Sequence, residues 1–308
     1  MYIEPRDVAP VDFPRSTATA PEITTLDLPL TFTHGVVWLN VPYARKSGMD
    51  LHLQIIWPPV QDWEADGAYP CVVFVQGSGW RAQSLGQWLL PLADFARRGY
   101  VVAIVEYRPS IVAPFPAQVA DAKSAVRFLR CTASDFRIDP AKLAIWGDSS
   151  GGHTALLAAF TPADEFSDDT DAEPLGLSAC VDFYGPTDIS RMNEEPAIAD
   201  HLGFDSAEGL LIGGYDLTER PDLVVPTVVA NHIPAGRTLP PVLMVHGDKD
   251  RVVPFAQSVN LYEALRAAGQ PVELYRLTDA DHASGAFWQP TVMDVVDQFL
   301  QRGFTAAG

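Results

Sequence analysis

The chain has 308 residues, of which 47% are hydrophobic and 19% charged, so it can bury a large core and is not a disordered protein. The 21 basic and 39 acidic residues leave a formal net charge of −18, which argues against nucleic acids and anionic membranes as partners, because both recruit clustered Lys and Arg. No apolar run approaches the roughly 18 residues that a membrane-spanning helix needs. Residues 1–10 also lack the apolar stretch of a secretory signal, and we therefore expect a cytoplasmic protein.

The first part of the chain contains few regular elements. Residues 1–45 are rich in Pro and Thr, and we expect an N-terminal arm with one short strand near 36–41. From Leu51 apolar and polar residues alternate, which predicts a half-buried strand that ends at Pro58. Residues 71–75 form a continuous apolar run of the kind found in buried parallel strands.

Helices and strands then alternate to the end of the chain. A helix that begins at Pro116 should turn Val119 inward and Asp121, Lys123 and Arg127 outward. The further predicted strands are residues 100–107, 142–146, 177–184, 242–246 and 272–277, and the further helices are 87–98, 150–160, 255–268 and 286–301.

This alternation predicts an α/β fold with a mostly parallel sheet covered by helices on both faces. We expect a single domain over residues 46–308. Residues 185–240 break the rhythm before the strand at 242–246, and their Gly and Pro predict an irregular insertion that covers a pocket. The acidic residues gather between 164 and 208, where we expect a solvated surface rather than a cation site.

The clearest chemical signal is the segment Gly147-Asp148-Ser149-Ser150-Gly151, which lies between a predicted strand and a predicted helix. It matches the pattern G-x-S-x-G, in which a tight turn presents the central serine at the carboxyl edge of a sheet. The spacing of the glycines selects Ser149 as the nucleophile and not Ser150. Gly152 follows and strengthens the match.

A serine nucleophile needs an oriented base, and after such a turn the acid precedes the histidine along the chain. Asp250 follows the strand at 242–246 and is the expected acid, with Asp248 as the alternative. His282 follows the strand at 272–277 and is the only histidine after Asp250. The sequence therefore predicts the triad Ser149, Asp250 and His282.

An oxyanion hole requires backbone N–H donors near the nucleophile. The strand at 71–75 runs into a Gly-rich segment, and we expect the amides of Gly77, Ser78 and Ser150 to be the donors. Gln76, Trp80 and Trp288 are candidates for the substrate pocket, although Trp288 also begins an amphipathic helix. The spacing of His and Cys residues does not suggest a metal site, and Cys71, Cys131 and Cys180 are expected to be free thiols.

These motifs together resemble α/β-hydrolase serine esterases, in particular the carbohydrate-esterase-like group of acetyl-xylan and feruloyl esterases and the hormone-sensitive-lipase-like esterases. The resemblance covers about residues 48–302 and rests on the segments 76–80, 107–108, 115–121, 147–153, 246–254 and on His282. The family usually has His-Gly-Gly-Gly-Trp in the oxyanion segment. Here Gln76 replaces the His and can still brace the loop, and Ser78 replaces the middle Gly.

The resemblance implies an α/β-hydrolase fold and a serine carboxylesterase for short-chain or aromatic acyl esters, with a carbohydrate alcohol as one option. No cofactor or metal is expected, and the partner is a small-molecule ester. Two alternatives stay open: an amide hydrolase of the arylformamidase type, and a hydrolase-fold binder without activity. Whether the chain is a monomer or a homodimer is open as well.

Overall fold

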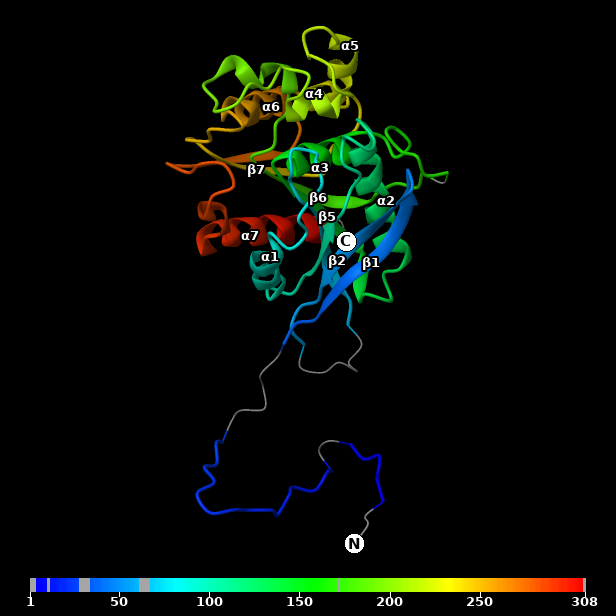
Figure 1. Cartoon of the computed structure of the whole chain (residues 1–308), viewed down its shortest axis with the longest axis vertical. Coiled ribbons are helices and arrows are strands. Elements are labelled where there is room, and N and C mark those ends of the chain that lie inside the picture. Colours follow the sequence, from blue (N-terminus) through cyan, green and yellow to red (C-terminus); the bar gives the residue numbers. More distant parts are fainter. Residues whose placement is uncertain (1–3, 10–11, 28–33, 61–66, 171, 307–308) are drawn as a thin grey trace. The chain divides into compact units, whose positions relative to one another are not determined.

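The computed structural model describes residues 4–9, 12–27, 34–60, 67–170 and 172–306 (Figure 1). The chain divides into two units, Met1–Phe32 and Thr33–Gly308. The described residues of the first unit contain no helix or strand. Every element discussed below belongs to the second unit.

One eight-stranded sheet forms the centre of this unit, with the strand order β1-β2-β4-β3-β5-β6-β7-β8. Strands β1 and β2 run antiparallel to their neighbours, and all other neighbours pair in parallel. The strands are β1 (Val37–Lys46), β2 (Met49–Ile56), β3 (Tyr69–Val75), β4 (Val101–Val105), β5 (Ile138–Asp148), β6 (Leu177–Phe183), β7 (Val242–Gly247) and β8 (Val272–Leu277). The predicted α/β fold with a mostly parallel sheet is thus confirmed.

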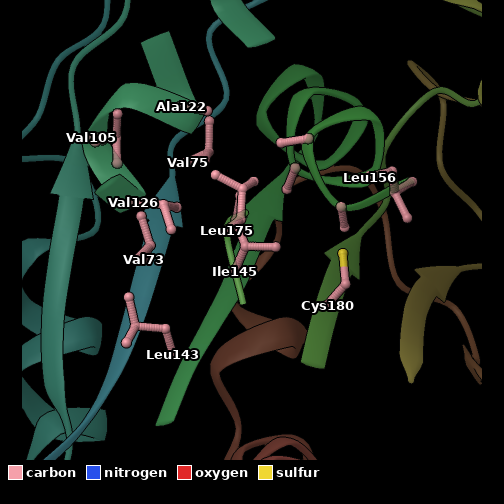
Figure 2. Close-up of a cluster of buried hydrophobic side chains, with 14 of the residues drawn as sticks. Val73, Val75, Val105, Ala122, Val126, Leu143, Ile145, Leu156, Leu175 and Cys180 are labelled. Atoms are coloured by element: carbon pink, nitrogen blue, oxygen red, sulfur yellow. The ribbon is translucent and has the colours of Figure 1, made fainter. Parts of the chain in front are cut away.

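Helices cover both faces of the sheet. Helices α2 (Ala117–Cys131), α3 (Ser150–Phe160) and α6 (Ala256–Ala267) pack on one face. Helices α1 (Leu89–Ala96) and α7 (Pro290–Ala306) pack on the other face. Figure 2 shows the first of these layers, where alternate side chains of the strands, such as Val73 and Ile145, meet α2 and α3. Strands buried on both faces explain the continuous apolar runs in the sequence.

The insertion folds into short helical turns. It contains η1 (Ile189–Glu194), α4 (Ala207–Leu211), α5 (Pro221–Val224), η2 (Val225–Thr227) and η3 (Val229–His232). These turns build a small apolar cluster of their own with Trp80. Val229 joins the main core, and the imidazole Nε2 of His153 on α3 lies 2.8 Å from the carbonyl oxygen of Thr227. The last turn before α7 is η4 (Gly285–Trp288).

The charged residues of α2 correct one prediction. Asp121, Lys123 and Arg127 were expected to face solvent, but all three are buried. Lys123 Nζ donates to the carbonyl oxygens of Pro162 and Glu165, and Arg127 donates to Asp169. The loop after α3 lies over α2 at this point, so the outward face of the helix is covered by chain that sequence periodicity does not reveal.

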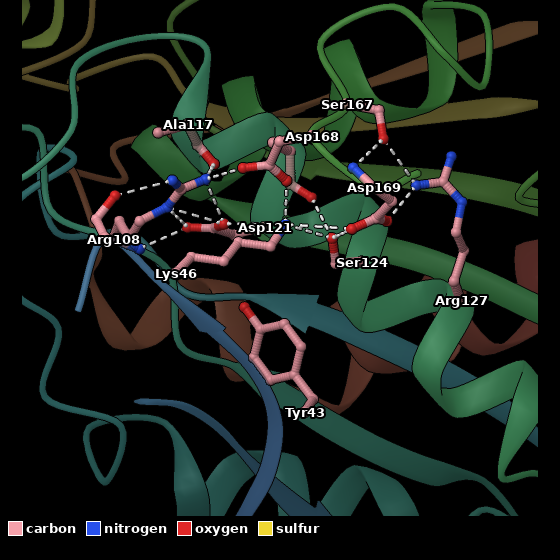
Figure 3. Close-up of polar contacts among 12 residues, drawn as sticks. Tyr43, Lys46, Arg108, Ala117, Asp121, Ser124, Arg127, Ser167, Asp168 and Asp169 are labelled. Atoms are coloured by element: carbon pink, nitrogen blue, oxygen red, sulfur yellow. Dashed lines mark hydrogen bonds and ion pairs between the residues drawn. The ribbon is translucent and has the colours of Figure 1, made fainter. Parts of the chain in front are cut away.

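Asp121 belongs to a network that ties four segments together (Figure 3). It accepts hydrogen bonds from Arg108 at 2.7 to 3.1 Å, and Arg108 also reaches Asp168 at 2.8 Å. Lys46 at the end of β1 is paired with Asp168 and Asp169. Part of the acidic stretch expected to be solvated surface is therefore held in ion pairs.

No helix of the described residues combines the length and apolar character needed to cross a membrane. Cys71 and Cys180 are buried in the sheet, Cys131 is exposed at the end of α2, and all three are free.

Candidate active site

Ser149 stands at the turn between β5 and α3 with φ 52° and ψ −128°, a backbone conformation that is strained for any residue with a side chain. Close packing around the turn makes this conformation possible. A Cβ atom at Gly151 would collide with the carbonyl oxygen of Val75, and one at Gly147 with the carbonyl oxygen of Gly151. The glycines of the motif are thus required because β3, β5 and α3 meet with no room for side chains.

The structure brings the three predicted triad residues together. The Nε2 atom of His282 lies 2.9 Å from Ser149 Oγ, and its Nδ1 atom lies 2.7 Å from Asp250 Oδ2. The three side chains follow β5, β7 and β8, whose carboxyl ends meet at one edge of the sheet. Asp248, the alternative acid, instead accepts a hydrogen bond from the amide of Asp279 at 2.7 Å.

Asp250 is held from several sides. Its Oδ1 atom accepts the amides of Val252 and Val253, both at 2.8 Å. His246 Nε2 lies 3.2 Å from Oδ2, and its Nδ1 lies 2.7 Å from Ser258 Oγ. Burial acts to raise the pKa of Asp250, but the hydrogen bonds from His246 and His282 outweigh it and hold the pKa well below its usual range. Asp250 is therefore an ionised partner for His282.

The Gly-rich loop after β3, which was expected to supply the oxyanion donors Gly77 and Ser78, approaches Ser149, and both of these amides have acceptors in this structure. The amide of Gly77 donates to Asp148 Oδ1 at 2.7 Å, and the amide of Ser78 donates to Ser150 Oγ at 2.9 Å. Within the described residues, the amides of Gly79 and Ser150 donate to no acceptor. Gly79, which the sequence analysis did not select as a donor, lines the same cavity as Ser149 and Ser150.

Asp148 connects this loop to the rest of the site. Its Oδ2 atom accepts from Trp88 Nε1 at 2.9 Å and from the Tyr184 hydroxyl at 3.3 Å. The ring of Tyr184 packs edge-on against His282, with 4.7 Å between the ring centroids. Burial raises the pKa of Asp148, and its hydrogen-bond donors oppose that rise. The G-x-S-x-G pattern leaves this position variable, so the motif gives no signal for its role.

A cavity of about 440 Å³ opens beside Ser149 and His282. Its walls come from the Gly-rich loop with Trp80, the segment after Asp250, and the insertion, which contributes His201 and Glu208. Trp80 was expected here and lines the cavity. Gln76 and Trp288, the two other pocket candidates, do not.

Both residues have structural positions instead. Gln76 is fully buried, and its Nε2 atom donates to the carbonyl oxygen of Ser84 at 2.9 Å, so it braces the loop from behind. Trp288 packs in an aromatic cluster with Trp88 and Trp146 on the face of the sheet that α1 and α7 cover. Across the described residues, no group of three or more His, Cys, Asp or Glu side chains is arranged to hold a metal ion.

The strand order, the serine turn between β5 and α3, and the acid and histidine at the same sheet edge define an α/β-hydrolase. The chain belongs to the BD-FAE family, whose model matches residues 53–265. The α/β-hydrolase fold and the family resemblance predicted from the sequence are therefore confirmed.

Curated relatives carry esterase names. The chain is 28% identical over 244 residues to the probable carboxylic ester hydrolase LipM of Mycobacterium tuberculosis, covering 78% of this chain and 54% of the relative. It is 27% identical over 239 residues to the carboxylesterase NlhH of the same organism, covering 73% of this chain and 68% of the relative. The chain thus spans about half the length of LipM.

Solved structures agree with the fold. A truncated carbohydrate esterase from gut microbiota matches with a TM-score of 0.73 and 28% identity, over 90% of this chain and 99% of that one. A thermophilic esterase from Thermogutta terrifontis with propionate bound matches with a TM-score of 0.68 and 27% identity, over 87% and 94% of the two chains.

Proposed function

We propose that this chain is a serine carboxylesterase that works through an acyl-enzyme. The observation that carries the proposal is the continuous hydrogen-bonded chain from Ser149 through His282 to Asp250, with distances of 2.9 and 2.7 Å. Such an arrangement lets the imidazole take the serine proton while the carboxylate fixes its tautomer. The esterase names of LipM, NlhH and the structural neighbours support the same reaction class.

The reaction then follows from the geometry. Ser149 Oγ attacks the ester carbonyl and its proton passes to His282 Nε2. The amides of Gly79 and Ser150 stabilise the oxyanion, and that of Ser78 joins them if the Ser150 hydroxyl rotates away. His282 returns the proton to the departing alcohol, and a water molecule activated by the same imidazole releases the acid. Asp250 stays ionised and stabilises the imidazolium.

The proposed substrates are short-chain or aromatic acyl esters, including esters on a carbohydrate alcohol. A cavity of about 440 Å³ has room for a small acyl group and part of an alcohol. The carbohydrate option is supported by the gut carbohydrate esterase among the structural neighbours. A membrane partner and a nucleic-acid partner are not proposed, because of the net charge of −18.

Turnover of 4-nitrophenyl acetate tests the proposal. Ser149→Ala should lower kcat by roughly 10⁴- to 10⁶-fold, because the triad residues act as a unit. Ser150→Ala is the matched control, and it should cost far less because it keeps its backbone amide. A serine-directed organophosphate should stop the wild-type reaction and add one phosphoryl group to the protein, detected by mass spectrometry.

Two outcomes would contradict the proposal. Hydrolysis that persists in Ser149→Ala would exclude this serine as the nucleophile. Faster turnover of N-formylkynurenine than of any ester in a panel of acetylated sugars and feruloyl esters would favour the amide-hydrolase alternative.

A further inference from the structure

Three hydroxyl groups form a hydrogen-bonded ring beside the candidate oxyanion hole. The Tyr107 hydroxyl, in the segment after β4, lies 2.8 Å from Ser78 Oγ and 3.3 Å from Ser150 Oγ. The amide of Ser78 donates to Ser150 Oγ at 2.9 Å and closes the ring. Tyr107 is 1% exposed and is not among the residues that line the cavity, so its hydroxyl acts behind the site and not on a substrate.

The hydrogen atoms of the ring have one arrangement that satisfies every contact. Ser78 Oγ donates to the carbonyl oxygen of Arg81 at 2.6 Å, which uses the only hydrogen of that hydroxyl. Tyr107 must therefore donate to Ser78 Oγ, and the Ser150 hydroxyl must donate to the Tyr107 oxygen. Burial raises the pKa of Tyr107 to about 12, so the phenol keeps its hydrogen at neutral pH.

The ring connects the two segments that carry the oxyanion donors. Ser78 directly precedes Gly79 in the loop after β3, and Ser150 is the first residue of α3. The N–H groups of Gly79 and Ser150 must both lie about 3 Å from the same oxygen atom to stabilise its negative charge. A contact that fixes Ser78 relative to Ser150 therefore fixes the spacing of the two donors.

Tyr107 is held in place by bonds that do not involve its hydroxyl. Its amide donates to Gln83 Oε1 at 2.8 Å, and Gln83 Nε2 donates to the carbonyl oxygen of Gln76 at 2.9 Å. The amide of Ser110 in the same segment donates to the Trp80 carbonyl oxygen at 2.7 Å. The loop and the segment after β4 should therefore stay folded when the phenol hydroxyl alone is removed.

We propose that the Tyr107 hydroxyl is a positioning group of the oxyanion hole. By binding the hydroxyls of Ser78 and Ser150, it fixes the distance between the amides of Gly79 and Ser150. This inference rests on the proposed esterase function and adds a residue outside the triad on which the rate depends. A glycine in place of Ser78 would have no hydroxyl for Tyr107 to bind, so the ring depends on the departure of this segment from Gly-Gly-Gly.

The kinetics of Tyr107→Phe on 4-nitrophenyl acetate test the proposal. The kcat should fall by roughly 10-fold, less than for loss of a donor itself, and KM should change by less than about 2-fold, because the oxyanion exists only in the transition state. The inhibition constant of 1,1,1-trifluoro-2-butanone should rise by a similar factor. The carbonyl carbon of this ketone bonds to Ser149 Oγ, the serine proton passes to His282, and the ketone oxygen takes the negative charge.

A double-mutant cycle with Ser78→Ala separates the ring from a general effect on folding. Ser78→Ala keeps its amide but removes the hydroxyl that Tyr107 binds, so it should lower kcat by a similar factor. In the Ser78→Ala background, Tyr107→Phe should then lower kcat by less than about 2-fold, because the phenol no longer holds the loop.

Tyr100→Phe is the matched control. It removes a buried tyrosine hydroxyl that is hydrogen-bonded to Asp297 and Gln301, in the core on the other face of the sheet. It should leave kcat, KM and the inhibition constant of the ketone as in the wild type.

Wild-type kcat in folded Tyr107→Phe would overturn the inference, and it would leave the esterase proposal intact as long as hydrolysis depends on Ser149. If Tyr107→Phe does not fold, wild-type kcat in Ser78→Ala would overturn it in the same way, since Ser78 is only half-buried. Losses that multiply in the double variant would show that the two hydroxyls act separately.

A kcat above the wild-type value in Ser150→Ala would show that the Ser150 hydroxyl blocks the Ser78 amide, and it would overturn the inference as well. Absence of Ser149-dependent hydrolysis in the wild type would instead count against the proposed function itself.

Discussion

Asp148 illustrates how a single buried carboxylate positions several parts of the candidate site. It holds the Gly77 amide, the Trp88 indole and the Tyr184 hydroxyl, and Tyr184 in turn packs on His282. The loop that offers the free amide of Gly79 therefore takes its position from this residue. Asp148 is a positioning residue in the proposed mechanism, since it acts through the loop.

Asp148→Asn should lower kcat on 4-nitrophenyl acetate by roughly 10- to 100-fold with a smaller change in KM, less than the loss of an oxyanion donor itself. An amide has only one acceptor oxygen for three donors, so the loop should shift. Asp279→Asn, at an exposed carboxylate of the same sheet edge, is the control. Equal kcat values for the two variants would show that Asp148 does not position the loop.

Asp182 carries a second buried carboxyl group, which lies in β6 below the serine turn. Its Oδ1 atom accepts the Gly185 amide at 3.0 Å, while Oδ2 is buried with no partner among the described residues. Burial raises the pKa of Asp182 to about 8. The folded protein therefore keeps this group protonated at neutral pH.

The raised pKa has a direct consequence for stability. A carboxyl group with a raised folded pKa stabilises most below the unfolded pKa of about 4 and loses this contribution as the pH rises through about 8. The Asp182→Asn variant cannot titrate at this position, so it does not lose this contribution as the pH rises. The difference between its free energy of unfolding and that of the wild type should therefore increase by up to about 1.4 kcal/mol per pH unit between about pH 4 and about pH 8. Urea denaturation at pH 5 and pH 8 measures the difference. Asp205→Asn, at an exposed carboxylate, is the control, and its free energy of unfolding should change with pH as that of the wild type does. If the free energy of unfolding of Asp182→Asn also changed with pH as in the wild type, the argument would be refuted.

At the scale of elements, α2 is joined to its surroundings by ion pairs. Asp121 on α2 is fully buried beside Arg108, whereas the side chain of Asp168 is 43% exposed. Removal of one partner from a buried pair leaves an uncompensated charge, whereas an exposed partner is replaced by water. The two carboxylates that hold Arg108 should therefore differ in their contribution to stability.

Asp121→Asn should destabilise the protein by roughly 3 to 5 kcal/mol, and Asp168→Asn by less than about 1 kcal/mol. Burial acts to raise the pKa of Asp168, but Lys46 and Arg108 outweigh it and lower the pKa below its usual value. Its contribution is therefore present above about pH 4 and is lost as the pH falls through the lowered pKa. Urea denaturation at pH 7 compares the variants, and equal destabilisation would contradict the distinction.

The serine turn is a second feature that depends on how neighbouring strands and helices pack. Gly147 and Gly151 are small because β5 and α3 pass each other and the end of β3 at contact distance. This packing explains why the motif can be recognised in the sequence. A Cβ atom at either position would collide with backbone atoms of a neighbouring segment, so only glycine fits.

At the scale of the second unit, the insertion is part of the folded core. Val229 packs with the sheet, and His153 Nε2 on α3 lies 2.8 Å from the carbonyl oxygen of Thr227 in the insertion. Trp80 from the Gly-rich loop is 2% exposed in the apolar cluster of the insertion. The insertion should therefore unfold together with the sheet.

Urea unfolding monitored by tryptophan fluorescence and by far-ultraviolet circular dichroism should give coincident transitions. Trp80 adds a signal from the insertion to that of the other tryptophans, which include the Trp88, Trp146 and Trp288 cluster on the sheet, and the dichroism reports on the helices and strands. Trp80→Phe is the control that removes the first signal. A fluorescence transition at lower urea that disappears in Trp80→Phe would show that the insertion opens independently.

The sequence by itself determined the features that depend on local backbone geometry and on chain order. Alternating apolar strands and amphipathic helices gave the α/β sheet, the required glycines marked Ser149, and the strand ends at Asp250 and His282 predicted the side chains that the structure brings together. Each of these signals is local, because a strand, a tight turn or a strand end constrains its own residues.

Only the tertiary structure decided which polar groups already have partners. It showed that Asp148 holds the Gly77 amide, that a loop buries the charges of α2, and that Trp288 packs away from the cavity that His201 lines. Such outcomes depend on contacts between residues far apart in the chain, and side-chain periodicity carries no information about which distant segment supplies the contact.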